Sequence, residues 1–134
     1  MNYYNEIKNK LIDNEVYKRV KDYSKNKNEL STYYEVGRLL IEAQGGENRA
    51  KYGNGLIKEY SKRLTSELGK GYTFIALSRM RQFYVLSEKV ATLSQQLSWS
   101  HYVEILKFSD INEINYYISI IESYNLSVKK LREK

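Results

Sequence analysis

The chain contains no proline among its 134 residues, and this absence limits its possible folds more than any other single feature. Proline is the residue that most often ends a helix, so its absence favours helix throughout. No segment alternates apolar and polar residues in the way that a half-buried strand requires. A chain of this length can bury one hydrophobic core without disulfides. The sequence therefore predicts an all-α fold in a single domain over residues 1–134.

The first 44 residues are predicted to form an N-terminal arm. We expect a short helix over 2–12, a break at Asp13-Asn14, and one long continuous helix from about Asn14 to Ala43. Apolar residues in the long helix recur in alternating steps of four and three, which is the spacing of a coiled-coil seam. Such a helix is too long for a small globule to cover, so the arm should form a helical hairpin or dimerise. The candidate dimerisation residues are Val16, Val20, Tyr23, Leu30, Tyr34 and Ile41.

Residues 45–134 are predicted to form a helix-turn-helix-like bundle. An amphipathic helical pattern ends at Gly69-Lys70-Gly71, and a second helix is expected from Thr73 to about Leu86. Two helices joined by a tight glycine turn are the plan of a DNA-binding helix-turn-helix. No acidic residue occurs in residues 68–87, a bias that suits a surface facing phosphates. The apolar side chains expected to face inward from the second helix are Leu77, Met80 and Tyr84.

The opposite face of this second helix supplies the candidate DNA-reading side chains. Arg79 and Gln82 are of the residue types that read guanine and adenine edges in the major groove. Lys70 and the backbone near Thr73 lie at a helix N-terminus, which favours a phosphate. An ordinary solvated surface with Ile75 packed on a neighbouring helix is the alternative, and Arg81 has either a phosphate or a buried acid as its partner. The full set of candidate DNA-binding residues is Lys70, Thr73, Ser78, Arg79, Arg81, Gln82, Lys129 and Lys130.

Three residues are predicted to cap the last helices of the chain. Ser98 precedes a helix that ends near Lys107, Asp110 precedes a helix with several isoleucines, and Ser127 precedes the final helical segment. Trp99 is interpreted as a buried anchor, and His101 as a core or capping residue. A solvated helix end is an equally good interpretation of Lys129 and Lys130.

Composition argues against several classes of protein. The chain has no cysteine, which fits the reducing cytoplasm, and no apolar run long enough to cross a membrane. Its single histidine has no partner at metal-ligand spacing, so no metal and no cofactor are expected. No nucleophile pattern is present. Glu6-Ile7-Lys8 has the Glu-x-Lys spacing of a nuclease site, but it lies on a predicted helix, whereas such a site needs this motif on a strand. We therefore predict no catalytic residue, no small-molecule substrate and no enzyme activity, while the net charge of +6 mildly favours an acidic partner.

Several blocks of the sequence resemble the N-terminal domain of the YhcG-like family. These blocks are Tyr52-Gly53, Gly71-Tyr72-Thr73, Met80-Arg81-Gln82-Phe83-Tyr84, Leu97-Ser98-Trp99-Ser100-His101-Tyr102 and Leu126-Ser127-Val128-Lys129-Lys130-Leu131-Arg132. The last block is also similar to the closing helix of ParB-type helix-turn-helix domains. Members of the YhcG-like family resemble nucleases of the PD-(D/E)xK class that carry a helical, DNA-binding N-terminal domain.

The resemblance implies that the chain binds DNA and positions a PD-(D/E)xK-type nuclease domain or subunit, the nuclease half itself being absent. A homodimer is expected from the seam in the N-terminal arm. The chain is expected to be either a fragment of a longer protein or a stand-alone version of the domain. The alternative function is a protein-interaction or inhibitor module that acts on DNA-handling machinery and is encoded by a phage, a defence system or a mobile element.

Overall fold

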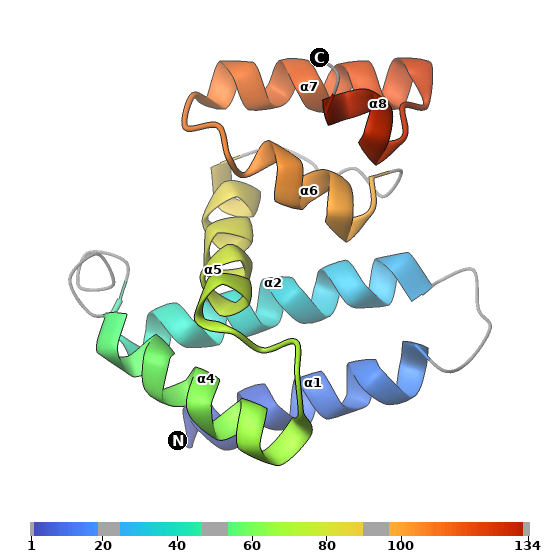
Figure 1. Cartoon of the computed structure of the whole chain (residues 1–134). Helices are drawn as coiled ribbons and strands as arrows, with labels where there is room; N and C mark the ends of the chain where they lie inside the picture. The colour runs from blue at the N-terminus through green and yellow to red at the C-terminus, as the bar shows by residue number, and fades with distance from the viewer. Residues whose placement is uncertain (1, 19–24, 47–53, 90–96, 133–134) are drawn as a thin grey trace.

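The computed structural model describes residues 2–18, 25–46, 54–89 and 97–132, and every regular element in these ranges is a helix (Figure 1). This confirms the predicted all-α class. The helices are α1 (Tyr3–Lys18), α2 (Lys25–Ala43), α4 (Asn54–Leu68), α5 (Phe74–Lys89), α6 (Trp99–Ile105), α7 (Ile111–Tyr124) and α8 (Val128–Arg132).

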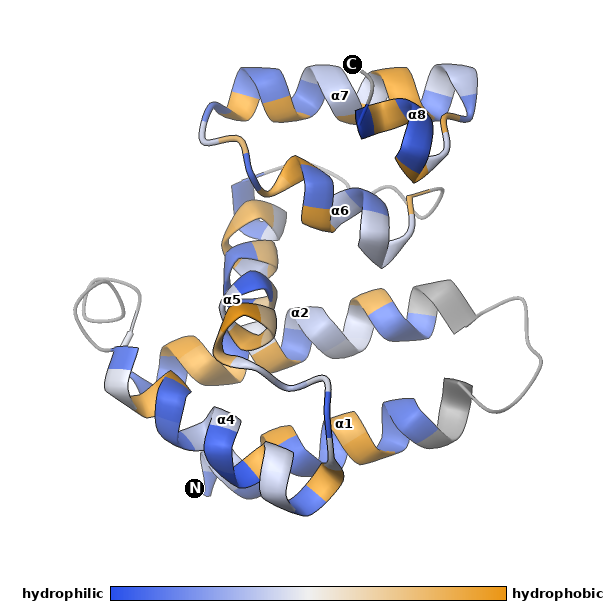
Figure 2. Ribbon diagram, in the orientation of Figure 1, coloured by the Kyte–Doolittle hydropathy of each residue, from blue (hydrophilic) through white to orange (hydrophobic). Residues whose placement is uncertain are grey.

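The helices form two layers that are joined by α5. One layer consists of α1, α2 and α4, with α1 and α2 lying side by side, and the other consists of α6, α7 and α8 (Figure 1). α5 packs chiefly on α2 and also contacts α4, and its C-terminal end reaches the second layer. Each helix carries both apolar and hydrophilic residues, as expected for helices that bury one face only (Figure 2).

The expected continuous helix from Asn14 to Ala43 is wrong, and so is the expected break at Asp13-Asn14. α1 runs through both residues to Lys18, and a separate helix, α2, begins at Lys25. Asn14 is 2% exposed, and its side-chain oxygen accepts a hydrogen bond of 3.0 Å from the side-chain amide of Asn28. Because a partner on α2 satisfies this buried polar group, Asn14 does not need to end the helix.

Three of the six candidate dimerisation residues have described side chains, and their own chain covers each of them at least partly. Leu30 and Ile41 are buried. Tyr34 donates a hydrogen bond to Glu88 of α5, and its ring lies 4.9 Å from that of Tyr84. Val16, Val20 and Tyr23 fall outside the side chains that the structure describes. Packing within one chain thus explains why the seam has apolar residues at Leu30 and Ile41. Dimerisation through the seam stays a prediction.

Gly37 lies at a close crossing of α2 and α5. A Cβ atom at this position would lie 2.2 Å from the carbonyl oxygen of Met80 and 2.8 Å from the Cβ atom of Tyr84. Both distances are far shorter than a van der Waals contact between such atoms. The two backbones can therefore meet at this distance only because residue 37 has no side chain.

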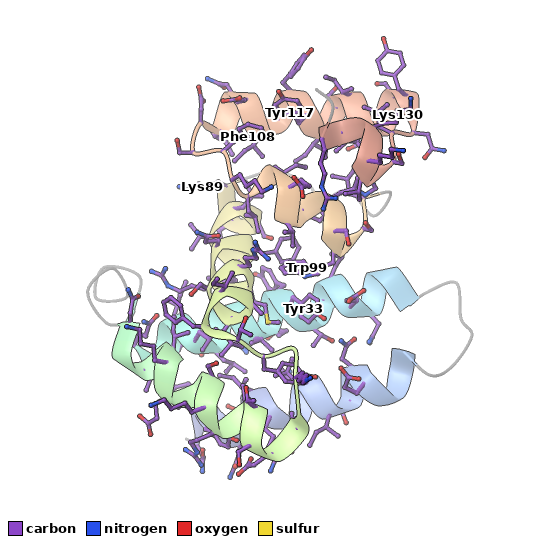
Figure 3. The ribbon with its side chains drawn as sticks, in the orientation of Figure 1. Tyr33, Lys89, Trp99, Phe108, Tyr117 and Lys130 are labelled. Carbon is purple, nitrogen blue, oxygen red and sulfur yellow. The ribbon has the colours of Figure 1, made fainter. Side chains whose placement is uncertain are left out.

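An aromatic cluster ties α2, α5 and α6 together around Phe83. The Phe83 ring is fully buried, and its centroid lies 5.3 Å from Trp99 and 4.9 Å from Tyr102. Trp99 is half-buried and also packs on Tyr33 of α2 at 4.6 Å (Figure 3). Such tilted and edge-to-face arrangements are the favoured geometries of aromatic pairs. Trp99 therefore anchors α6 to α2 and α5 as predicted, but it is half-buried and not buried as expected. Phe83 was not singled out from the sequence.

The predicted caps of the last three helices are confirmed. The hydroxyl of Ser98 accepts from the backbone of His101 at 3.3 Å, and the side chain of Asp110 accepts from Asn112 at 2.9 Å. Ser127 accepts from the backbone of Lys130 at 3.2 Å. His101 also accepts from the Ser98 backbone through Nδ1, while its Nε2 lies 2.8 Å from the carbonyl oxygen of Leu126. His101 thus caps α6 and links that helix to the segment before α8.

Tyr72, in the turn after α4, connects this turn to α1. Its buried hydroxyl donates a hydrogen bond of 2.8 Å to Glu15. Burial, followed by the nearby Glu15 carboxylate, raises the pKa of Tyr72 above its ordinary value. Burial and Glu67 raise the pKa of Tyr4 to about 12 in the same way.

Raising the pH above the ordinary tyrosine pKa of 10.0 is expected to destabilise the fold. In that range the unfolded chain releases the Tyr72 proton first, so the stability that is present below pH 10.0 falls as the pH rises. Each tyrosine that retains its proton only when folded lowers the free energy of unfolding by up to about 1.4 kcal/mol per pH unit. Urea titrations at several alkaline pH values give the free energy of unfolding as a function of pH. For Tyr72→Phe this free energy should fall less steeply with rising pH than it does for the parent. Equal slopes for the parent and this variant would contradict the assignment.

Candidate nucleic-acid interface

The turn between α4 and α5 has a geometry fixed by its own residues. α4 ends at Leu68, and Gly69 and Gly71 then adopt φ values of 100° and 111°, which favour glycine. The hydroxyl of Thr73 accepts a hydrogen bond of 3.1 Å from the backbone of Ala76, in the first turn of α5. The predicted pair of helices with a glycine turn is therefore present, and Lys70 is exposed in that turn.

α5 has a wide buried face and a narrower exposed one. The buried residues are Leu77, Met80, Phe83 and Leu86, so both layers of the molecule cover this helix. Tyr84, predicted to face inward, is half-buried. Ile75 is 59% exposed and Gln82 is exposed, so Ile75 does not plug a neighbouring helix. Arg79 lies three residues before Gln82 and is half-buried on the same side of the helix.

A cavity of about 560 Å³ lies between the C-terminal half of α5 and the connection from α6 to α7, and we call it the α5–α7 cavity. Among the residues that the structure describes, three cationic side chains and no acidic one line it. Lys89 comes from the last turn of α5, and Phe108 comes from the facing connection (Figure 3). The described residues that line it are Arg81, Gln82, Val85, Leu86, Lys89, Leu106, Lys107, Phe108, Ser109, Ile111 and Ile114.

A second, smaller cavity of about 340 Å³ shares Lys107 and Phe108 with the first and also contacts α8. Glu104 in its wall accepts hydrogen bonds from Lys107 and from Arg132, each 2.8 Å long. These two hydrogen bonds hold the pKa of Glu104 below its ordinary value, so the carboxylate stays charged and keeps both cations in place. The Phe108 ring stacks on Tyr117 with a centroid distance of 4.8 Å and an angle of 8°.

The structure brings some of the predicted DNA-binding residues together and separates others. Arg81 and Gln82 both line the α5–α7 cavity. Lys70 and Thr73 lie at the other end of α5, and Ser78 is half-buried between the two ends. Lys129 and Lys130 are exposed on α8, in the second layer, and Figure 3 shows Lys130 well away from Lys89. These residues therefore do not form one continuous patch.

Lys89, Lys107 and Phe108 were missed by the sequence reasoning. Lys89 follows the expected end of its helix at about Leu86, and α5 continues to include it. Lys107 and Phe108 lie in a short connection that carries no recognisable motif. A hint was available in the pattern, because Lys89 follows Val85 by four residues and so shares a helix face with it.

Other kinds of site find no support in the described residues. No group of three His, Cys, Asp or Glu side chains is arranged there to hold a metal ion. None of the helices in these ranges combines the length and apolarity needed to cross a bilayer. The Glu6-Ile7-Lys8 triplet lies on α1, where Ile7 is buried and Lys8 forms an ion pair of 2.8 Å with Glu67.

Comparison with known proteins identifies one family and one relative. The model of the DUF1016 N-terminal domain matches residues 7–134. A protein of Escherichia coli (strain K12) described as "Putative nuclease YhcG" is 42% identical over 72 residues, which are 51% of this chain and 19% of the relative. The match thus spans about a fifth of the relative's length. No solved structure matches the chain.

Proposed function

This chain belongs to the DUF1016 N-terminal domain family, and from this membership we propose that it is a DNA-binding module that positions a PD-(D/E)xK-type nuclease. The nuclease description belongs to the relative, whose matched stretch overlaps this chain. The present chain would supply DNA binding and not catalysis. One observation supports the absence of a catalytic role. The chain has one Glu-x-Lys triplet, and its lysine, Lys8, forms an ion pair with Glu67.

The observation that carries the proposal is the exposed side of α5 next to the glycine turn. Arg79 and Gln82 lie three residues apart on this side, and Lys70 is exposed in the turn before it. No acidic residue occurs in residues 68–87 to oppose a phosphate. Arg and Gln side chains can form paired hydrogen bonds with base edges, while each Lys near the backbone releases counterions.

Lys129 and Lys130 would contribute to DNA binding only through phosphates. Both are exposed on α8, a helix of five residues, and Ser127 caps its start through the backbone of Lys130. Phosphate contacts fix the position of a protein on DNA without reading its sequence. α8 and the N-terminal half of α5 lie apart. A DNA molecule that contacts residues on both helices would therefore have to extend across both helical layers.

The proposal is tested by fluorescence anisotropy with a labelled duplex at about 50 mM and about 200 mM salt. The parent should bind at the lower salt concentration and weaken steeply at the higher one. Arg79→Ala combined with Gln82→Ala should weaken duplex binding by about tenfold or more, because both candidate base contacts are lost. Circular dichroism should show unchanged helicity, since neither side chain is fully buried.

Lys62→Ala is the matched control for this double variant. Lys62 is exposed on α4, so its removal deletes one positive charge without touching α5. A double variant that binds no more weakly than Lys62→Ala would show that α5 does not read DNA. Failure of the parent to bind duplex or single-stranded DNA at the lower salt concentration would refute the proposed function.

A protein-interaction module is the second candidate, and one observation favours it. Tyr116 and Tyr124 on α7 are 60% and 74% exposed. Exposed tyrosines of this kind are enriched in protein interfaces. A parent that binds no DNA, but captures a partner with little dependence on salt, would support this candidate instead.

A further inference from the structure

We infer that the α5–α7 cavity binds one unstacked nucleotide of a DNA strand, with its phosphate near Lys89 and Lys107 and its base against Phe108. This inference rests on the proposed DNA-binding function and adds a ligand to it. It concerns the C-terminal end of α5, at the opposite end from the glycine turn.

The size and composition of the cavity fit a ligand that is part charged and part flat. Its volume of about 560 Å³ lies within the range of about 300–1,000 Å³ that is typical of small-molecule sites. Leu86 and Ile114 are buried and form its apolar floor, whereas Lys89, Lys107 and Ser109 are exposed at its edge. A ligand can therefore enter from solvent with its polar end at the rim.

Cationic side chains at the exposed edge of the cavity can attract an anion, and one of them, Lys107, is held by an ion pair. Among the described residues, Arg81, Lys89 and Lys107 line the cavity and no acidic residue does. Glu104 fixes Lys107 from the side of the second cavity at 2.8 Å, and its other oxygen is taken by Arg132. Lys89 forms no ion pair among the described residues. Its ammonium group is thus available to a phosphate.

Phe108 offers a prearranged ring for the base. Its stacking on Tyr117 fixes the ring plane, and Tyr117 is itself held edge-on by Tyr116 with a centroid distance of 5.4 Å. Aromatic rings beside a cationic groove are the usual platform for bases of single-stranded DNA. A base inside a duplex is covered on both faces by its neighbours, so only an unstacked base can use this ring.

A nucleotide explains the cavity better than an acidic peptide segment does. In a peptide, the carboxylates that neutralise Lys89 and Lys107 and the apolar group that meets the ring of Phe108 would have to come from different residues. A nucleotide carries its negative charge and its flat ring within one unit, as this lining requires.

The test compares a labelled single strand of about eight thymidines with a blunt hairpin duplex, both in about 50 mM salt, for the whole chain and its variants. Lys89→Gln and Phe108→Leu should each weaken binding of the single strand by about tenfold. Neither should change duplex binding more than Lys62→Gln does, because Lys62 lies on α4, away from the cavity. A strand containing iodouracil should also crosslink to Phe108 of the parent under ultraviolet light.

The outcomes separate this inference from the proposed function. A parent that binds the duplex but not the single strand overturns the nucleotide site and leaves the duplex-binding proposal standing. If the parent binds neither the duplex nor the single strand, the nucleotide site and the proposed function are both overturned. If Phe108→Leu is misfolded, the crosslink in the parent decides, and a crosslink elsewhere overturns the inference. A polyglutamate peptide that binds in its place, and is lost in Lys89→Gln, would assign the cavity to an acidic protein segment.

Discussion

Phe83→Ala is expected to lower the free energy of unfolding by about 3–5 kcal/mol, the usual cost of removing a buried aromatic ring. The ring is completely buried and touches both Trp99 and Tyr102, so its loss leaves a cavity where α2, α5 and α6 meet. Urea denaturation followed by circular dichroism measures this change. A small domain is stable by only about 5–15 kcal/mol, so the variant should lose a large fraction of its stability.

Ile75→Ala is the control for this substitution, because it shortens an apolar side chain on the same helix. Ile75 is 59% exposed, so its loss should change stability by no more than about 0.5 kcal/mol. A Phe83→Ala variant as stable as Ile75→Ala would show that the aromatic cluster does not hold α5 to the second layer.

Gly37→Ala is expected to lower the free energy of unfolding by about 2 kcal/mol or more. Its new methyl group would lie 2.2 Å from the carbonyl oxygen of Met80, so α2 and α5 would have to move apart. Overpacking of this kind costs about 1–3 kcal/mol, and more where a rigid backbone is the obstacle. The gain in helix propensity from glycine to alanine, about 1 kcal/mol, opposes it only in part. Thermal and urea unfolding measure the net effect.

Gly55→Ala supplies the matched control, because it makes the same substitution near the start of α4. A Cβ atom at position 55 would meet nothing within 4 Å, and this residue has no positive φ. This variant should therefore be as stable as the parent or more stable by up to about 1 kcal/mol. Equal stabilities for Gly37→Ala and Gly55→Ala would refute the close crossing of α2 and α5.

The sequence predicted those parts of the fold that depend on local chemistry. Gly69 ends α4, and Ser98 and Asp110 cap α6 and α7, because glycine in a left-handed turn and a polar side chain before a helix act within a few residues. The break expected at Asn14 was wrong because its hydrogen-bond partner, Asn28, comes from another helix. No local pattern indicates such a partner.

The α5–α7 cavity could not be predicted from the sequence for a related reason. Lys89 and Phe108 are separated by nineteen positions, and only the packing of α6 and α7 near the end of α5 brings them to one cavity. The candidate residues on α5 were easier to find because a single helix presents Arg79 and Gln82 together. A site formed by one helix can be recognised in the sequence from the spacing of its residues. A site formed between two layers can be recognised only when the arrangement of the layers is known.

The crossing at Gly37 has a mechanical consequence for the two ends of α5. Met80, whose carbonyl oxygen faces Gly37, lies near the middle of this helix, which is about 24 Å long. A tilt of α5 would therefore pivot about this crossing. A tilt of about ten degrees about this point moves each end by about 2 Å, in opposite directions. The glycine turn and the mouth of the α5–α7 cavity thus move together, and the crossing angle at Gly37 sets the position of both relative to α2.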